Sequence, residues 1–295
     1  IRRNDGSYFK QSLPPVEFAY SAATIEQTVR ELDTESADNL PAGIDGTNYQ
    51  WIDLDGDGVA GILSEHANSW FYKRNVSPKN IVIENNVAHT LAKFAPLEIV
   101  STHPSFTGIA GGNAMQFLDL EGDGRPDLAN FSSLTPGFFE HEETGEWLPH
   151  RAFTSLPRIN WSDPNLKFVD LTGDGHADIL ISEESVFTWY PSLGEAGFDE
   201  GEKSYQPLDD EKGPRLVFAD ELQTVFLADL SGDGLTDIAR IRNGEVCYWP
   251  NLGYGRFGNK VTMDNAPLFD RPDQFDHRRI RLADIDGSGT TDIIY

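Results

Sequence analysis

One thirteen-residue segment recurs five times without gaps along the 295-residue chain, and this repeat limits the possible folds more than any other feature. Its copies cover residues 51–63, 117–129, 168–180, 227–239 and 282–294. The first aspartates of the copies are separated by 66, 51, 59 and 55 residues. A period in this range is typical of one four-stranded propeller blade with its loops. The repeat therefore predicts an all-β fold, a β-propeller of four-stranded antiparallel blades with five motif-bearing blades.

Each copy centres on an acidic, glycine-rich pattern, Asp-x-(Asp/Glu/Thr/Ser)-Gly-(Asp/Ser)-Gly-x-x-Asp, flanked by short apolar runs. The apolar runs predict two strands of a hairpin. The two glycines permit positive φ and hence a tight turn between the strands. We number the pattern from position 1 to position 9, so the five loops are 53–61, 119–127, 170–178, 229–237 and 284–292.

Side-chain oxygens at positions 1, 3, 5 and 9, with a carbonyl at position 7, suit Ca²⁺, which prefers hard oxygen ligands. The sequence thus predicts structural calcium sites of weak affinity, roughly 10⁻⁴ to 10⁻³ M. The first loop is expected to be degenerate, because Gly61 stands at position 9. The alternative is that these aspartates cap turns with no metal. The predicted ligands are Asp119, Glu121, Asp123 and Asp127; Asp170, Thr172, Asp174 and Asp178; Asp229, Ser231, Asp233 and Asp237; Asp284, Asp286, Ser288 and Asp292; and, in the degenerate loop, Asp53, Asp55 and Asp57.

A second shared element follows the motif in three repeats, at 70–75, 186–198 and 246–257. It is an aromatic strand, followed in the last two by a glycine-rich turn and a phenylalanine. We expect its aromatic rings to pack between neighbouring blades, with a ligand platform as the alternative. Cys247, in a strand-like run, is expected to be a buried, inert thiol. His176, at position 7 of the third loop, is expected to face solvent.

The remaining segments raise questions of organisation. Residues 21–32 could form a short helix, and residues 81–112 are expected to form an extended loop between blades. The N-terminal 50 residues could complete the last blade, or a further blade could lie beyond residue 295, so the propeller would have five or six blades. Because the chain opens without Met, we expect residues 1–295 to be a single propeller domain taken from a longer protein.

Charge and missing motifs exclude several classes of function. The chain has 48 acidic and 23 basic residues, a formal net charge of −25. This charge argues against binding a nucleic-acid backbone or an anionic membrane surface, since both require clustered Lys and Arg. No apolar stretch is long enough to span a membrane. No nucleophile elbow, phosphate loop, dinucleotide fingerprint or metal-spaced histidine pair is present. We therefore expect a protein that is not an enzyme.

The repeats resemble the FG-GAP/VCBS type of integrin α-chain propellers and of many secreted bacterial proteins. The sequence around the repeats is still more similar to the B component of bacterial insecticidal toxin complexes, in the middle region shared with SpvB-type proteins. The segments that carry this similarity are residues 1–9, 15–20, 39–46, 49–58, 61–65 and 70–75. The repeat motif is generic, whereas these first 75 residues carry the specific part of the resemblance.

The resemblance implies a role without chemistry. In such toxins the B component joins the C component in a hollow shell around a cytotoxic polypeptide, and its propeller docks on the channel-forming A component and gates the exit. The resemblance thus implies a secreted protein with the A and C components as partners. The alternative is a secreted, calcium-stabilised propeller for adhesion, integrin-like or lectin-like. It would show equivalent aromatic and polar pockets between all blades.

Overall fold

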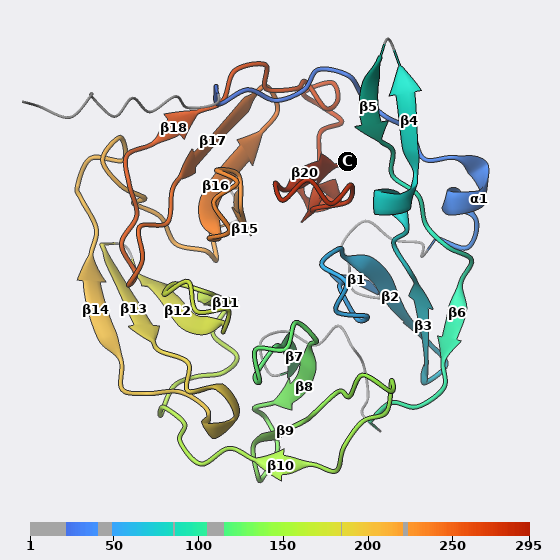
Figure 1. Cartoon of the computed structure of the whole chain (residues 1–295). Helices are drawn as coiled ribbons and strands as arrows, with labels where there is room; N and C mark the ends of the chain where they lie inside the picture. The colour runs from blue at the N-terminus through green and yellow to red at the C-terminus, as the bar shows by residue number, and fades with distance from the viewer. Residues whose placement is uncertain (1–21, 41–48, 85, 105–114, 184, 221–223) are drawn as a thin grey trace, which may run out of the picture.

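The computed structural model describes residues 22–40, 49–84, 86–104, 115–183, 185–220 and 224–295. Four four-stranded antiparallel sheets stand around a ring as the blades of a propeller, which confirms the predicted all-β fold class (Figure 1). The described helices are short: α1 (Thr34–Ala37) and the 3₁₀ turns η1 (Ser77–Lys79), η3 (Gly194–Ala196) and η5 (His277–Arg279). None of the helices in these residues is long and apolar enough to cross a membrane.

Each complete blade places its strands in sequence order from the axis outwards (Figure 1). The first blade consists of β1 (Tyr49–Ile52), β2 (Gly61–His66), β3 (Ser69–Lys73) and β6 (Glu98–Val100). The second consists of β7 (Met115–Leu118), β8 (Asp127–Asn130), β9 (Gly137–Phe139) and β10 (Arg151–Ala152). The third consists of β11 (Leu166–Val169), β12 (Asp178–Glu183), β13 (Val186–Tyr190) and β14 (Glu202–Tyr205). The fourth consists of β15 (Val225–Ala228), β16 (Asp237–Arg242), β17 (Glu245–Trp249) and β18 (Val261–Thr262).

The fifth repeat forms a two-stranded hairpin of β19 (Arg281–Ala283) and β20 (Asp292–Ile294). This hairpin closes the ring against the first blade. Asn75 Nδ2 donates a hydrogen bond of 2.9 Å to the Ile285 carbonyl, and the Arg281 guanidinium lies 5.6 Å from the Tyr49 ring centroid. The ring therefore has five positions, four of them filled by complete blades.

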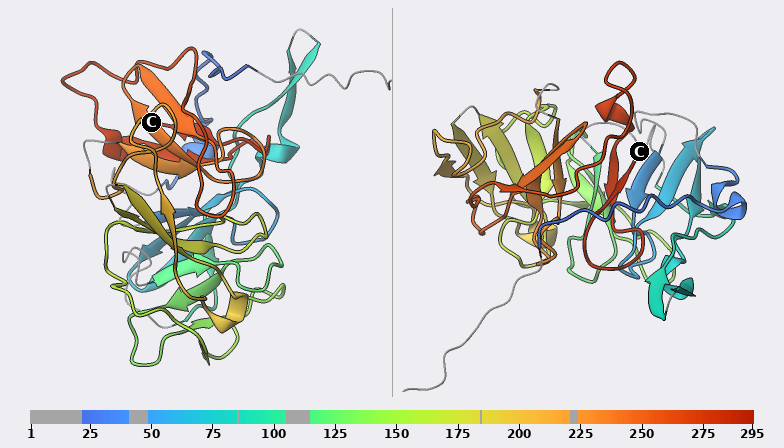
Figure 2. Two further views of the ribbon diagram at one scale, coloured as in Figure 1. Left: turned by 90° about the vertical axis from the view of Figure 1, so that its left-hand side faces the viewer. Right: turned by 90° about the horizontal axis from the view of Figure 1, so that it is seen from above.

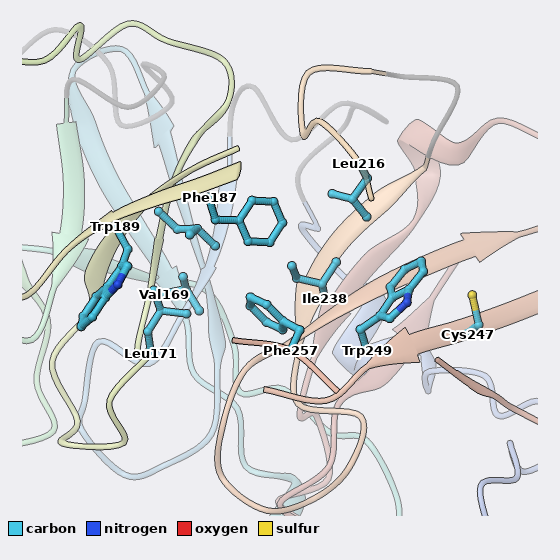
Figure 3. Close-up of a cluster of buried hydrophobic side chains, with 10 residues drawn as sticks. Val169, Leu171, Phe187, Trp189, Leu216, Ile238, Cys247, Trp249 and Phe257 are labelled. Carbon is cyan, nitrogen blue, oxygen red and sulfur yellow. The ribbon is translucent and has the colours of Figure 1, made fainter. Parts of the chain in front are cut away.

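The cores lie between blades. The largest cluster joins Phe187 and Trp189 of the third blade to Ile238, Trp249 and Phe257 of the fourth (Figure 3). Buried apolar residues are nearly continuous along the inner strands, because each blade is covered on both faces by its neighbours. The prediction that the aromatic element packs between blades is confirmed at this seam. Cys247 is fully buried in the same cluster, as expected.

The predicted loop at 81–112 is wrong for its described part. Strands β4 (Ile81–Glu84) and β5 (Val87–Thr90) form a separate antiparallel hairpin, inserted between β3 and β6. The hairpin stands out from the ring (Figures 1 and 2), and Ile83 is 73% exposed on it. This insertion gives the first repeat the longest period.

The predicted helix at 21–32 is also wrong over residues 22–32, which contain no helix. Thr24 and Ile25 instead lie extended beside Asp264, and the Ile25 N–H donates to the Asp264 carbonyl at 3.0 Å. β-Branched residues favour this pairing over helix. No strand from residues 22–40 pairs with the fifth hairpin. Residues 1–21 and 41–48 lie outside the described residues. They include the similar segments at 1–9 and 15–20 and most of the one at 39–46, and most of the N-terminal residues that could complete the last blade.

Candidate functional site

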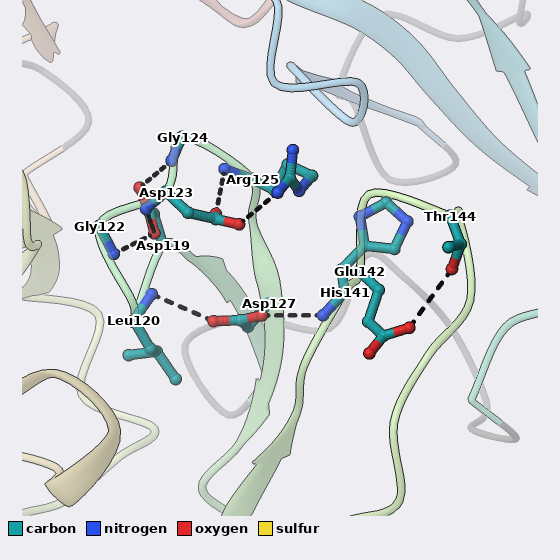
Figure 4. A network of polar contacts seen from close by, with 10 residues as sticks. All are labelled: Asp119, Leu120, Gly122, Asp123, Gly124, Arg125, Asp127, His141, Glu142 and Thr144. Carbon is teal, nitrogen blue, oxygen red and sulfur yellow. Dashed lines mark hydrogen bonds and ion pairs between the residues drawn. The ribbon is translucent and has the colours of Figure 1, made fainter.

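The position 1 aspartates hold the loops together. Asp119 accepts the Gly122 N–H at 2.7 Å on one carboxylate oxygen and the Gly124 N–H at 2.8 Å on the other (Figure 4). Both glycines have positive φ, 75° and 85°, which turns their N–H groups into the loop. The same pair of bonds is made by Asp53, Asp170, Asp229 and Asp284.

Positions 3 and 5 add further turn contacts. Asp123 accepts the Arg125 N–H at 2.9 Å and pairs with the Arg125 guanidinium at 2.7 Å. The position 5 residues Asp57, Asp174, Asp233 and Ser288 accept the N–H at position 7 in the same way. Thr172 and Ser231 donate at position 3 to the carboxylates of Asp170 and Asp229. Turn-capping contacts are therefore present in all five loops.

Within the part of the chain that the structure describes, the position 9 aspartates of the second, third and fourth loops belong to no group of three carboxylates with oxygens within 4.8 Å of one another. Asp178, fully buried, accepts the Leu171 N–H at 2.9 Å and the Ser192 N–H at 2.7 Å. Asp127 and Asp237 bind the equivalent groups. Burial raises the pKa of all three carboxyls to about 6. These side chains join the turn to the segment that directly follows the third strand, a structural role that the motif alone did not predict.

The fifth loop fits a cation best. Among the described residues, it is the one predicted site where three carboxylates, those of Asp284, Asp286 and Asp292, bring oxygens within 4.8 Å of one another. Burial, together with the charges of Asp286 and Asp284, raises the pKa of Asp292. Three hard oxygen donors at this spacing match what Ca²⁺ prefers. In the first loop, by contrast, Arg74 pairs with Asp55 at 2.9 Å.

A second carboxylate group was not predicted from the sequence. Glu121, at position 3 of the second loop, lies with Glu140 and Glu195 so that their oxygens are within 4.8 Å. Arg151 bridges the latter two, at 2.8 Å from Glu140 and 2.6 Å from Glu195. Burial and the two neighbouring carboxylates raise the pKa of Glu121 to about 7. Glu140 and Glu195 lie outside the repeated motif, so no pattern marks them.

The five loops also touch one another in a ring. In each loop the position 7 side chain lies over the position 4 glycine of the preceding loop. The pairs are Arg125 over Gly56, His176 over Gly122, Leu235 over Gly173, Thr290 over Gly232 and Val59 over Gly287. His176 Nδ1 lies 3.2 Å from the Asp119 carbonyl, so the expectation that it faces solvent was wrong. The acidic loops therefore gather around the axis on one face of the propeller.

A shallow pocket of about 400 Å³ opens between the second and third blades. Tyr190 lines it from the third blade, beside Asp199 and Glu200, and Arg158 and Leu156 line it from the segment that joins the blades. Phe198 lines it as well, and aromatic side chains with a few polar groups beside them are typical of small-molecule sites. Tyr190 and Phe198 belong to the aromatic element at 186–198, so this pocket is where the ligand-platform alternative would place a ligand.

Comparison with known proteins gives a structural likeness. No known family pattern and no curated protein sequence matches the chain. A Tc holotoxin pore of Photorhabdus luminescens is 25% identical, with a TM-score of 0.56, over 84% of this chain and 11% of that one. The crystal structure of TcdB2-TccC3-Cdc42 is 18% identical over 86% of this chain and 14% of that one, with a TM-score of 0.47.

A lectin from Agrocybe aegerita that recognises non-reducing terminal N-acetylglucosamine is 18% identical, with a TM-score of 0.42, over 84% of this chain and 60% of that one. The TM-scores of the lectin and of TcdB2-TccC3-Cdc42 are too low to argue from. The chain spans only 11% and 14% of the two toxin-complex chains. It is a propeller structurally similar to a component of a Tc toxin.

Proposed function

We propose that this propeller is a non-enzymatic module of a secreted toxin-complex B component. It docks the shell that B forms with the C component onto the channel-forming A component, and it gates the exit of the toxin. The likeness to the Photorhabdus luminescens Tc holotoxin pore carries the proposal, because it extends over 84% of the chain. The similar segments in the first 75 residues also favour the toxin-complex B component.

The charge distribution supports a docking role. The net charge is −25, and the ring contacts gather the acidic loops on one face around the axis. A field of one sign attracts an oppositely charged partner and weakens as salt screens it. A basic surface on the A component would therefore seat on this face.

Binding to the A component at rising salt tests the proposal. We expect docking to weaken with salt, and the isosteric variant Asp233→Asn to weaken it at low salt. Asn at this position keeps the oxygen that accepts the Leu235 N–H. The matched control is Glu183→Gln, which removes one exposed charge at the β12–β13 end of a blade, opposite the acidic loops. Salt-independent binding, or equal effects of both variants, would count against docking through the acidic face.

We further propose that Ca²⁺ binds at the fifth loop and has a structural role. Asp284, Asp286 and Asp292 supply the carboxylate oxygens, and the ion would offset their mutual repulsion. Bound there, it would brace the hairpin that closes the ring.

A sugar-binding adhesion propeller is the second candidate, and the pocket beside Tyr190 favours it. An aromatic ring offers an apolar face to a sugar, while Arg158, Asp199 and Glu200 offer donors and acceptors to its hydroxyls. A glycan array separates the two candidates. Binding that is lost in Tyr190→Ala and kept in Tyr205→Ala, a control on an exposed ring, would favour adhesion.

A further inference from the structure

The hairpin of β4 and β5 grows out of the first blade on the face of the acidic loops. It lies in the connection between β3 and β6, the third and fourth strands of that blade. At the start of this connection, Asn75 Nδ2 donates to the Ala60 carbonyl of the first loop at 3.1 Å and to the Ile285 carbonyl of the fifth loop at 2.9 Å. The base of the hairpin is therefore bonded directly to the acidic loops.

Hydrogen bonds below the hairpin fix its direction. The Val76 N–H donates to the Lys93 carbonyl at 2.8 Å, and the Leu91 N–H donates to the Asn80 carbonyl at 3.1 Å. Asn80 Nδ2 returns a bond of 2.9 Å to the Leu91 carbonyl. The two chains thus stay paired from the blade up to β4 and β5. A protrusion held in this way loses little conformational freedom when a partner covers it.

One face of the hairpin is apolar and exposed. Ile81 and Ile83 are 59% and 73% exposed, and Ala88, which opposes Ile83, is exposed as well. His89 lies on the other face, where its Nδ1 is 3.3 Å from the Arg30 guanidinium. A two-stranded hairpin is only marginally stable in water by itself, and clustered exposed apolar residues mark interaction sites. The face of Ile81 and Ile83 is therefore the part of the hairpin that a partner would cover.

The hairpin projects from the same face as the acidic loops. Both views of Figure 2 show it, in teal, reaching past the blades. A partner that covers the acidic loops therefore meets the hairpin as well and needs a groove to receive it. The groove is apolar where it faces Ile81 and Ile83, because polar groups buried against them would lose their hydrogen bonds to water. Such a partner combines a basic area with an apolar groove beside it.

We propose that the hairpin of β4 and β5 is the second part of the docking surface, and that its Ile81 and Ile83 face fills an apolar groove of the channel-forming A component. This inference rests on the docking function proposed above. The acidic loops attract the basic area of the A component over a distance, and salt screens this attraction. The hairpin supplies an apolar contact that salt does not screen.

Ile83→Ser is the deciding variant. Its matched control is Ile99→Ser, at an isoleucine of the same blade that is 63% exposed on β6, outside the hairpin. The protein, in its assembly with the C component, is bound to immobilised A component at low and at high salt. We expect Ile83→Ser to weaken binding about tenfold or more at both salt concentrations, since it removes one buried apolar side chain from the interface. Ile99→Ser is expected to leave the affinity unchanged.

A fluorescent label gives a second measurement that does not depend on a loss of affinity. Ala88→Cys carries an environment-sensitive dye on the same face as Ile83, and Ile99→Cys carries it at the control position. Cys247 is fully buried and does not compete for the label. On binding to the A component, the emission of the dye at residue 88 is expected to shift to the blue, and that at residue 99 to stay as it is.

The outcomes separate this inference from the docking function. Equal affinities of Ile83→Ser and Ile99→Ser, with native binding intact, would overturn the hairpin contact and leave the docking function standing. No binding of the native protein to the A component would overturn both. Binding that is independent of salt but weakened by Ile83→Ser would support the hairpin and remove the acidic loops from the interface.

Two other occupants of the hairpin are tested with the same variants. Sedimentation of the protein alone detects a second copy, and flotation with phosphatidylcholine vesicles detects a membrane. Self-association or flotation that Ile83→Ser abolishes, while binding to the A component stays unchanged, would overturn the proposal and assign the hairpin to that occupant.

Discussion

The Tyr72 hydroxyl occupies, in the first blade, the space that a side chain at Gly61 would need. A Cβ atom on Gly61 would lie 2.5 Å from Tyr72 Oη. The hydroxyl accepts the Leu54 N–H at 3.2 Å and donates to the Ile52 carbonyl at 3.2 Å. In the other loops the N–H equivalent to that of Leu54 goes to the closing aspartate. The missing aspartate of the first loop is therefore replaced by a tyrosine from the third strand.

This replacement predicts an energetic coupling between residues 61 and 72. Tyr72→Phe leaves the buried Leu54 N–H without a partner and is expected to lower the free energy of unfolding by about 1–3 kcal/mol. Gly61→Asp forces a side chain into the Tyr72 ring and is expected to cost about as much. In the double variant the hydroxyl no longer obstructs residue 61 and the new carboxylate can accept the Leu54 N–H, although ring carbons Cζ and Cε2 still lie 2.6 and 2.7 Å from the added Cβ and must shift. The loss in the double variant should therefore be smaller than the sum by about 1 kcal/mol. Urea unfolding of the four proteins gives the coupling.

Tyr248→Phe is the matched control for this cycle. Tyr248 holds the equivalent place in the fourth blade, where Asp237 already accepts the Leu230 N–H. Its removal of a hydroxyl is expected to change stability much less than Tyr72→Phe. Additive effects of Gly61→Asp and Tyr72→Phe would show that the hydroxyl does not stand in for the aspartate.

The repeat predicted the blades because each copy contains two local signals, one for a turn and one for the strands on either side of it. Each copy carries a turn, and each copy carries the two apolar runs that become the first and second strands, such as Leu166–Val169 and Asp178–Glu183. The recurrence of the copies then indicates stacked, similar sheets. The hairpin of β4 and β5 was missed because it occurs once, although Asn86, at φ 66°, follows an apolar run as a hairpin turn would.

The candidate site was harder to predict, because its contacts join different repeats. The motif predicts one role, cation binding, for positions 1, 3, 5 and 9, whereas position 9 bonds to the residue two positions after the third strand. A sequence signal for this was present: His141, Ser192 and Asn251 each lie 14 residues after their aspartates. Nothing local links Glu121 to Glu195, which meet because the second and third blades are neighbours.

The buried closing aspartates make stability depend on pH. Burial raises the folded-state pKa of Asp178 to about 6, above an unfolded value of about 3.9. Between these two values the folded state binds more protons, so stability rises as pH falls from 7 towards 4. With a chelator present, we expect the free energy of unfolding in urea to be higher at pH 5 than at pH 7.

Asp178→Asn isolates this effect, since Asn does not titrate. Its stability should change less between pH 7 and pH 5 than that of the native protein, whatever its absolute level. Asp174→Asn, on the exposed part of the same loop, should keep the native slope. If all three proteins show the same slope, the titration of Asp178 does not contribute.

Calcium is expected to stabilise the protein through the fifth loop. With a dissociation constant of about 10⁻³ M, 10 mM Ca²⁺ adds about 1.4 kcal/mol to the free energy of unfolding. Asp286→Asn removes one of the three convergent carboxylates and should abolish most of the gain, whereas Asp123→Asn, whose native carboxylate pairs with Arg125, should retain it. Thermal unfolding and calorimetric titration after chelator treatment measure both. No heat and no rise in Tm would remove the calcium proposal.

Alanine substitutions at two glycines of the fourth loop test whether neighbouring loops of the ring contact one another. Gly232 and Gly234 both have positive φ, 73° and 86°, so alanine is strained at either. A Cβ on Gly232 would lie 2.9 Å from Thr290 Cγ2 of the fifth loop, whereas Gly234 has nothing within 4 Å. Gly232→Ala should therefore destabilise the protein more than Gly234→Ala, by about 1 kcal/mol or more. Thr290→Ser removes the obstructing methyl group and should restore most of this difference in the Gly232→Ala background, since the backbone strain is common to both variants. Equal losses in the two alanine variants would mean that the side chain of Thr290 does not press on the fourth loop, and the fifth loop would then be held by other contacts, such as the bond of 2.9 Å from the Thr291 N–H to the Asp229 carbonyl.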